Sequence, residues 1–147
     1  MSHSDSSANI DRAREYYVRL DAGRSDLLDL FADDFEFYFP KYGIGVGKAA
    51  FVECATGLGN AVSSLAHDQA GLRFFVSGDD VVVVEGTTSG TDQAGIPWKG
   101  GETPGGRFCS LFEFGTDGLV TRMHIYLDPD YTGQDEGRFH WGHGRRW

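Results

Sequence analysis

The first forty residues switch between helical and extended patterns in a way that limits the folds open to this chain. Apolar residues recur at helical spacing from Ile10 to Leu20, and a second, shorter apolar cluster over 25–31 predicts another short helix. Residues 35–39 then alternate phenylalanine with polar residues, which predicts a strand with one wholly aromatic face. Pro40 ends it. A helical layer must therefore pack against a sheet.

The middle of the chain continues this mixture of helix and strand. Residues 48–58 carry an apolar stripe that predicts a third helix. Residues 72–76 and 81–88 predict two strands, the second rich in valine, joined by a Ser-Gly-Asp-Asp turn. A loop of about fifteen residues follows and holds Trp98; loops of this length are more often lids or disordered arms than plain connections.

The last predicted unit is a β-hairpin of residues 107–114 and 119–127 around a four-residue turn. If Phe114 pairs with Leu119, Ser110 lies opposite Met123. This pairing gives one apolar face made of Phe108, Ser110, Phe112, Met123 and Ile125. The opposite face would pair Arg107 with Tyr126, Cys109 with His124, and Leu111 with Arg122.

Composition narrows the classes of protein that this chain can belong to. With 147 residues it is one domain, for which we expect a disordered N-terminus (1–8), a domain (9–130) and an aromatic, basic tail (131–147) that packs on the domain or on a partner subunit. A net charge of −9 argues against binding to nucleic acid. The chain has no apolar run of about 20 residues and no signal-like leader, so we expect a cytoplasmic protein that does not bind membranes.

The pattern "YYVRLDAGRSDLLDLFADDFEFYFP" and the order of elements resemble the nuclear-transport-factor-2-like (NTF2-like) superfamily, which holds ketosteroid isomerase, scytalone dehydratase and the SnoaL-type cyclases. Over about residues 10 to 128, the resemblance implies an α+β fold in which a curved antiparallel sheet wraps N-terminal helices into a cone with a ligand pocket. It does not fix an activity, because the superfamily includes isomerases, dehydratases, cyclases, binding proteins and adaptors.

The apolar strand faces would line such a pocket and suit a flat, hydrophobic ligand. The alternative is that these side chains simply fill a core. The residues that we expect to contact a ligand are Phe35, Phe37, Phe39, Trp98, Phe108, Ser110, Phe112, Met123, Ile125 and Leu127.

The resemblance also implies catalytic residues. Tyr16 matches the tyrosine that donates a hydrogen bond to the substrate in ketosteroid isomerase, an enzyme that also serves as a standard example of pKa tuning. Phe39 and Ser110 stand where that isomerase carries its two carboxylates, which disfavours its mechanism here.

The stretch "LAHDQAGLRFFVSGDDVVVVEG" resembles the histidine-bearing strand of dehydratases related to scytalone dehydratase. On this match His67 is the general base, Tyr16 polarises a carbonyl, and Asp68 orients the imidazole or acts as a second acid. An imidazole suits this role because it exchanges protons near neutral pH. The alternative is a half-exposed histidine that ends a helix beside a solvated aspartate.

The remaining polar residues indicate a subunit interface but no metal site. Arg122, His124 and Tyr126 share the strand face away from the pocket, with Glu36 and Tyr38, where we expect a homodimer interface. The pair His140 and His143 lies among glycines without further ligands, so we expect no metal, and no cofactor motif is present.

These observations favour a cofactor-independent acid–base enzyme of dehydratase, isomerase or cyclase type, acting on a small hydrophobic substrate that could be polycyclic. The alternative is a non-catalytic protein that binds a small hydrophobic ligand in the same cavity. A third option, a protein-interaction adaptor, requires a solid core in place of the cavity.

Overall fold

A computed structural model describes residues 3–147 and has the expected α+β architecture. Its helices are α1 (His3–Asp21), α2 (Lys48–Leu58) and the short 3₁₀ helices η1 (Ser25–Leu30), η2 (Gln69–Gly71) and η3 (Glu136–Phe139). Its strands are β1 (Phe31–Phe39), β2 (Gly43–Val46), β3 (Val62–His67), β4 (Arg73–Ser77), β5 (Val81–Asp92), β6 (Pro97–Lys99), β7 (Arg107–Phe114) and β8 (Val120–Leu127).

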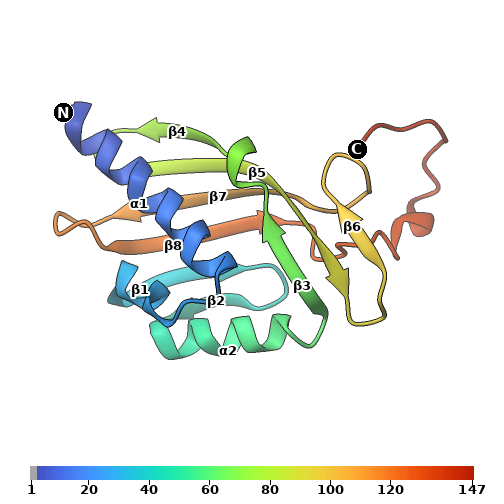
Figure 1. Cartoon of the computed structure of the whole chain (residues 1–147), viewed down its shortest axis with the longest axis horizontal. Helices are drawn as coiled ribbons and strands as arrows, with labels where there is room; N and C mark the ends of the chain where they lie inside the picture. Colours follow the sequence, from blue (N-terminus) through green and yellow to red (C-terminus); the bar gives the residue numbers. More distant parts are fainter. Residues whose placement is uncertain (1–2) are drawn as a thin grey trace.

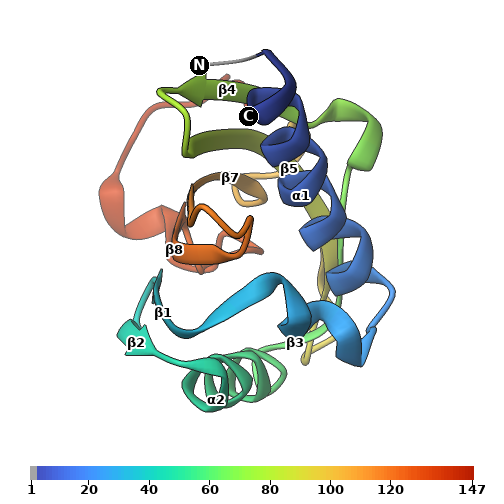
Figure 2. The same ribbon diagram turned by 90° about the vertical axis from the view of Figure 1, so that its left-hand side faces the viewer.

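The strands form one strongly curved, open sheet in the order β2-β1-β8-β7-β5-β3. Its pairings are antiparallel except for β1 with β8, which are parallel, so the sheet is mixed where we expected it to be antiparallel. Figures 1 and 2 show α1 lying across one face of the sheet, while α2 lies beside the edge formed by β1 and β2. The face under α1 is the inner face.

The long strand β5 produces much of the curvature by changing partners along its length. Its first half pairs with β4 and β7, and its second half pairs with β3 and β6. The change requires a close approach at Gly90, where a Cβ atom would lie 2.1 Å from the carbonyl oxygen of Ser64. Only glycine fits there, because any side chain would collide with β3.

Aromatic side chains from β1 and β7 fill the inner face against α1. In β7 every second residue from Phe108 to Phe114 is buried, as the alternation of a half-buried strand requires. Phe31 and Phe35 stack at 4.2 Å between ring centroids, and Tyr16 of α1 packs edge-on against Phe112. Burial of each such ring stabilises the fold by about 1.5–3 kcal/mol.

The hairpin of β7 and β8 has the expected faces but not the expected pairs. Ser110 pairs with Ile125, two residues away from the predicted Met123. One residue of the shift comes from the turn, because Gly115 donates to the carbonyl of Leu119 and shortens the loop. The other comes from a bulge at Thr121. A shift of two preserves the face of every side chain.

The same shift corrects the pairs that we predicted on the outer face. Cys109 lies opposite Tyr126, Leu111 lies opposite His124, and Glu113 lies opposite Arg122.

Several segments contain secondary structure that the sequence analysis did not predict. Helix α1 begins at His3 and so includes residues 3–8 of the N-terminus that we expected to be disordered; residues 1 and 2 lie outside the described residues. The predicted connector after Pro40 contains β2, and the long loop around Trp98 contains β6, which pairs with β5. Strand β3 ends in His67, which the sequence analysis placed in a strand only through its resemblance to the dehydratases.

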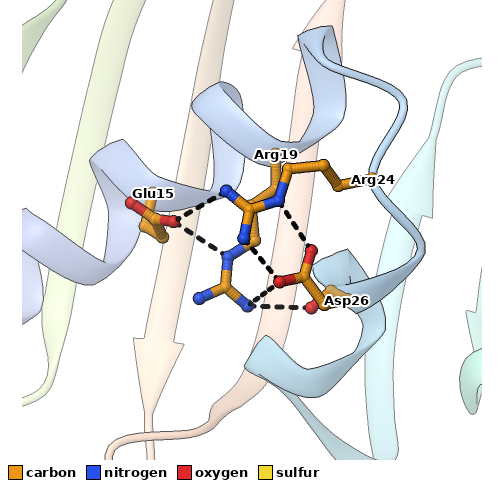
Figure 3. Close-up of polar contacts among 4 residues, drawn as sticks. All are labelled: Glu15, Arg19, Arg24 and Asp26. Carbon is orange, nitrogen blue, oxygen red and sulfur yellow. Dashed lines mark hydrogen bonds and ion pairs between the residues drawn. The ribbon is translucent and has the colours of Figure 1, made fainter.

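An ion-pair cluster holds the end of α1 against η1 (Figure 3). Arg19 bonds to Glu15 at 2.9 Å and donates to the carbonyl of Asp26, whose carboxylate is also bound by both Nε and Nη2 of Arg24. The cluster is largely exposed, so it adds little stability by itself. Its consequence is local, because it fixes the last turn of α1, where Asp21 lies.

Candidate functional site

A cavity of about 90 Å³ lies between α1, α2 and the inner face of the sheet. Its wall includes seven of the residues that the sequence analysis selected: Tyr16, Phe39, His67, Phe108, Ser110, Ile125 and Leu127. Most of the remaining wall is apolar, with Tyr17, Thr88, Tyr131 and Cys54 as further polar or sulfur-bearing members. The structure thus brings Tyr16 and His67 into one cavity.

The other selected residues lie away from the cavity. Phe35, Phe37, Phe112 and Met123 are at most 1% exposed and pack within the core. The rings of β1 stack on one another, and Phe37 packs edge-on against Phe51 of α2. Trp98 is buried against Tyr131, and its indole N–H donates to Thr88. Trp98 therefore supports the cavity wall from behind, through Thr88 and Tyr131.

His67 ends β3 and forms a close pair with Asp21 at the end of α1. Its Nδ1 lies 2.7 Å from Oδ1 of Asp21, and its backbone N–H donates to Oδ2 of the same carboxylate at 2.8 Å. Gln69 donates a third hydrogen bond to Asp21. A carboxylate that accepts from both the ring and the backbone of one histidine fixes that imidazole in place.

The carboxylate bonded to His67 is therefore that of Asp21, whereas we expected Asp68 to orient the imidazole or to act as a second acid. Asp68 is exposed and caps η2 by accepting from the amide of Gly71. Asp21 carries no sequence signal for this role beyond its position at a helix end. It lies 46 residues from His67 in the chain, and only the packing of α1 beside β3 brings them together.

The position of the Asp21 carboxylate determines which nitrogen of the His67 ring faces it. Burial alone would raise the pKa of Asp21, but the hydrogen bonds and charge of His67, together with Gln69, outweigh it and hold that pKa below its ordinary value. The charged carboxylate accepts the proton of Nδ1, which leaves Nε2 with a free lone pair in the neutral ring. Nε2 has no hydrogen-bond partner within residues 3–147.

Two adjacent tyrosines supply hydroxyl groups to the same cavity. Burial raises the pKa of Tyr16 well above its ordinary value, and the neighbouring Tyr17 raises it further. Burial also raises the pKa of Tyr17, although an interaction of its hydroxyl with the Ser110 side chain, which does not meet hydrogen-bond geometry, offsets part of the rise. Both phenols therefore stay protonated at neutral pH and act as hydrogen-bond donors.

The Tyr17 hydroxyl is buried and has no hydrogen-bond partner among the described residues. Its ring packs on the imidazole of His67 at 4.8 Å between centroids, and Ser110, which is 1% exposed, is its polar neighbour. An unsatisfied hydroxyl in an apolar site costs about 1–3 kcal/mol. An oxygen of a bound molecule at this position would remove that cost.

The size of the cavity limits what it can enclose. For comparison, an engineered apolar cavity of about 150 Å³ binds benzene. At about 90 Å³, the present cavity encloses only a small group, such as a carbonyl with its neighbouring carbons. A larger ligand must extend beyond it or displace wall side chains.

A second histidine pair lies on the opposite face of the sheet. Nε2 of His124 lies 2.7 Å from Oε2 of Glu36, and Arg122 and Tyr126 approach Nδ1 of the same ring at 3.3 and 3.4 Å. These are residues that we expected on the outer face. They form one polar cluster, which does not reach the cavity.

Two further observations concern metals and membranes. Within residues 3–147, no group of three or more His, Cys, Asp or Glu side chains is arranged to hold a metal ion. No helix in the same part of the chain combines the length and apolar composition that crossing a membrane requires.

Comparison with solved structures identifies the fold. An NTF2-like protein of unknown function from Burkholderia pseudomallei has a TM-score of 0.71 at 18% identity, covering 88% of this chain and 93% of that one. A proposed polyketide cyclase from Xanthomonas campestris pv. campestris has a TM-score of 0.74 at 16% identity, covering 88% and 98%. TerC, co-crystallised with polyporic acid, has a TM-score of 0.69 at 23% identity, covering 82% and 92%.

The sequence comparison agrees with the structural one. No curated protein matches this chain. Residues 13–123 match the SnoaL-like domain family. This range runs from within α1 into β8 and includes every residue of the cavity wall except Ile125, Leu127 and Tyr131. The chain belongs to the SnoaL-like domain family, and its fold is similar to that of NTF2-like proteins.

Proposed function

We propose that this protein is a cofactor-independent acid–base enzyme that acts on a small hydrophobic molecule bearing a carbonyl group. One observation carries the proposal: an oriented imidazole with a free nitrogen and an unpartnered tyrosine hydroxyl occupy the same apolar cavity. Groups of this kind cluster at sites of proton transfer.

In the proposed mechanism, Nε2 of His67 removes a proton from the carbon next to the carbonyl. The C–H electron pair forms a carbon–carbon double bond, and the carbonyl π electrons move to oxygen, which accepts hydrogen bonds from Tyr17 and Ser110. Asp21 stabilises the imidazolium that results. The carbonyl then re-forms. In an isomerisation of an unsaturated ketone, the double bonds shift and the imidazolium returns the proton to the far carbon of the conjugated system; in a dehydration, the C–O bond on the β-carbon breaks and the imidazolium protonates the departing hydroxyl. In a cyclisation, the enolate carbon attacks a second carbonyl and the proton goes to that oxygen.

The roles of the two tyrosines follow from their partners. Tyr17 is the first choice for the carbonyl-binding donor, because its hydroxyl lacks any other partner among the described residues. Tyr16, which the sequence resemblance selected, lines the same cavity and is a second donor.

Membership in the SnoaL-like family supports this class of chemistry, as does the resemblance to a proposed polyketide cyclase. TerC, with polyporic acid, supports the view that this fold takes up a small organic molecule.

Proton exchange with solvent tests the proposal directly. A panel of small methyl ketones and cyclic enones is incubated with the protein in D₂O, and deuterium next to the carbonyl is followed by NMR. We expect the wild type to accelerate exchange of at least one compound and His67→Ala to remove the acceleration. Binding without any exchange would instead support the non-catalytic binding protein.

We also propose that the outer face of the sheet binds a second copy of the chain. Ladder partners place Tyr38, His124, Leu111 and Val83 in one row across β1, β8, β7 and β5, with Ile44 and Phe75 at its ends. The adjacent row alternates Glu36, Arg122 and Glu113, a charge pattern that can complement itself across a two-fold axis.

A cytoplasmic location also stays a prediction.

A further inference from the structure

A second hollow adjoins the cavity. It has a volume of about 320 Å³ and lies between the turn that joins β1 to β2, the end of α2 and Pro129 after β8. Phe39, Cys54 and Leu58 line both the cavity and this outer hollow. Because the two spaces share these walls, small movements of Phe39 and Leu58, both only half-buried, would join them.

The outer hollow has one cationic side chain on its wall, Lys41. The chain has three lysines. Lys48 pairs with Asp33 and Lys99 pairs with Glu102, whereas Lys41 has no ion-pair partner within residues 3–147. The unpaired ammonium of Lys41 beside apolar walls favours an anionic group at this end of whatever enters the hollow, through local attraction between opposite charges.

We propose that the ligand is an amphiphile with a carbonyl at one end and a carboxylate at the other. This inference rests on the proposed function, which places the carbonyl beside Tyr17 and His67. The cavity encloses the carbonyl end, an apolar middle passes between Phe39 and Leu58, and the carboxylate lies beside Lys41. The two volumes explain how a cavity too small for a ring can serve a larger molecule.

Chain length is the variable that tests this arrangement. Methyl-ketone acids of formula CH₃CO(CH₂)ₙCO₂⁻, and their methyl esters, are titrated against the full-length protein by calorimetry at low salt. Burial of each added methylene strengthens binding of both series. The acids should show an additional gain over the esters, confined to the lengths at which the carboxylate reaches Lys41.

The variants separate the charge at Lys41 from charge in general. Lys41→Met should weaken binding of the best acid by about fivefold, as expected for a partly exposed ion pair, and leave its ester unchanged. Added salt should reduce the same gain. Lys48→Met removes a lysine outside the hollow and should change neither series. Circular dichroism confirms that each variant is folded.

Three results would overturn the inference: no measurable binding of any acid, acids that never exceed their esters, or a gain that survives Lys41→Met. Because calorimetry does not depend on turnover, the proposed function fails separately. Acids that bind through Lys41 but never exchange hydrogen would refute the acid–base chemistry alone. Hydrogen exchange that proceeds, together with acid binding that Lys41→Met does not change, would refute only the proposal of an amphiphilic ligand.

Discussion

Two carboxylate–histidine pairs, Asp21–His67 and Glu36–His124, lie on opposite faces of the same sheet. Each joins a ring nitrogen to a carboxylate oxygen at 2.7 Å, and each histidine side chain is 9% exposed. In both pairs the pKa of the carboxyl is lowered, with hydrogen bonding by the histidine among its main causes. By distance and burial of the ring alone, the pairs are indistinguishable.

The pairs differ in the second nitrogen of the ring. Arginine can only donate, so Nδ1 of His124 accepts from Arg122, and its Nε2 carries the proton given to Glu36. Both nitrogens of His124 are thus engaged. In His67, Nδ1 carries the proton and Nε2 remains open. A histidine can transfer protons to a ligand only through a nitrogen that the protein leaves free.

The largest expected effect separates the two histidines by activity. His67→Ala should lower the rate of hydrogen exchange into a ketone substrate by about 10² to 10⁴, the usual contribution of a general base. His124→Ala removes an equally buried ring from the other face and should change the rate less than threefold. The rates are measured by NMR in D₂O. Equal losses of exchange rate in the two variants would show that the free Nε2 of His67 is not the base.

The next effect concerns the outer face. Leu111→Arg places a charge in the row beside His124, and an unpaired charge in an interface should weaken self-association at least about a hundredfold. Val18→Arg, on an exposed apolar residue of α1, is the matched control and should leave association unchanged. Sedimentation velocity gives the oligomeric state, and a wild type that is monomeric at micromolar concentration would contradict the dimer.

A smaller effect tests whether the carboxylates position their histidines. Asp21→Asn should lower the exchange rate about ten- to a hundredfold, because a misplaced base is a poorer base, while affinity for the ketone changes little. Glu36→Gln should leave the rate near that of the wild type. A loss of affinity equal to the loss of rate would point to a collapsed cavity in Asp21→Asn, against a positioning role.

The lowered pKa of Asp21 also predicts how stability depends on pH. In the folded protein, the Asp21 carboxyl stays charged at pH values below its ordinary pKa of 3.8. Its contribution to the free energy of unfolding is therefore complete above pH 3.8 and is lost as the pH falls through the lower pKa of the folded state. We expect Asp21→Asn to be less stable than the wild type by about 1–2 kcal/mol at pH 7, allowing for partial exposure. Urea unfolding at pH 7 and near pH 2 should show that difference disappearing in acid.

The smallest expected effect is a gain in stability, in contrast to the loss expected for Asp21→Asn. Tyr17→Phe removes the unpartnered buried hydroxyl and should stabilise the ligand-free protein by about 1 kcal/mol while weakening binding of a ketone. Tyr126→Phe alters a hydroxyl on the outer face and should not affect ketone binding. Urea unfolding and calorimetry measure the two quantities. A destabilised Tyr17→Phe protein would indicate that the hydroxyl has a partner in solution.

Local patterns in the sequence predicted the fold class and the faces of the strands. Alternation from Phe35 to Phe39 and from Phe108 to Phe114 identifies the inner face, because side chains of a strand point to opposite sides in turn. These assignments survived an error of two residues in the β7–β8 register, since an even shift keeps each residue on its face. In contrast, which residues of β7 and β8 lie opposite one another depends on the turn and on the bulge at Thr121, which the sequence pattern did not predict.

The sequence by itself determined which kinds of side chain this protein could use: tyrosines on the first helix, a histidine before the valine-rich strand, and an aromatic cone. Only the tertiary structure decided which of them meet. It paired His67 with Asp21 across 46 residues, left the Tyr17 hydroxyl without a partner among the described residues, and moved Phe112 into the core. The physical reason is that local periodicity specifies the direction of a side chain, whereas its partner and the space around it depend on how distant elements pack.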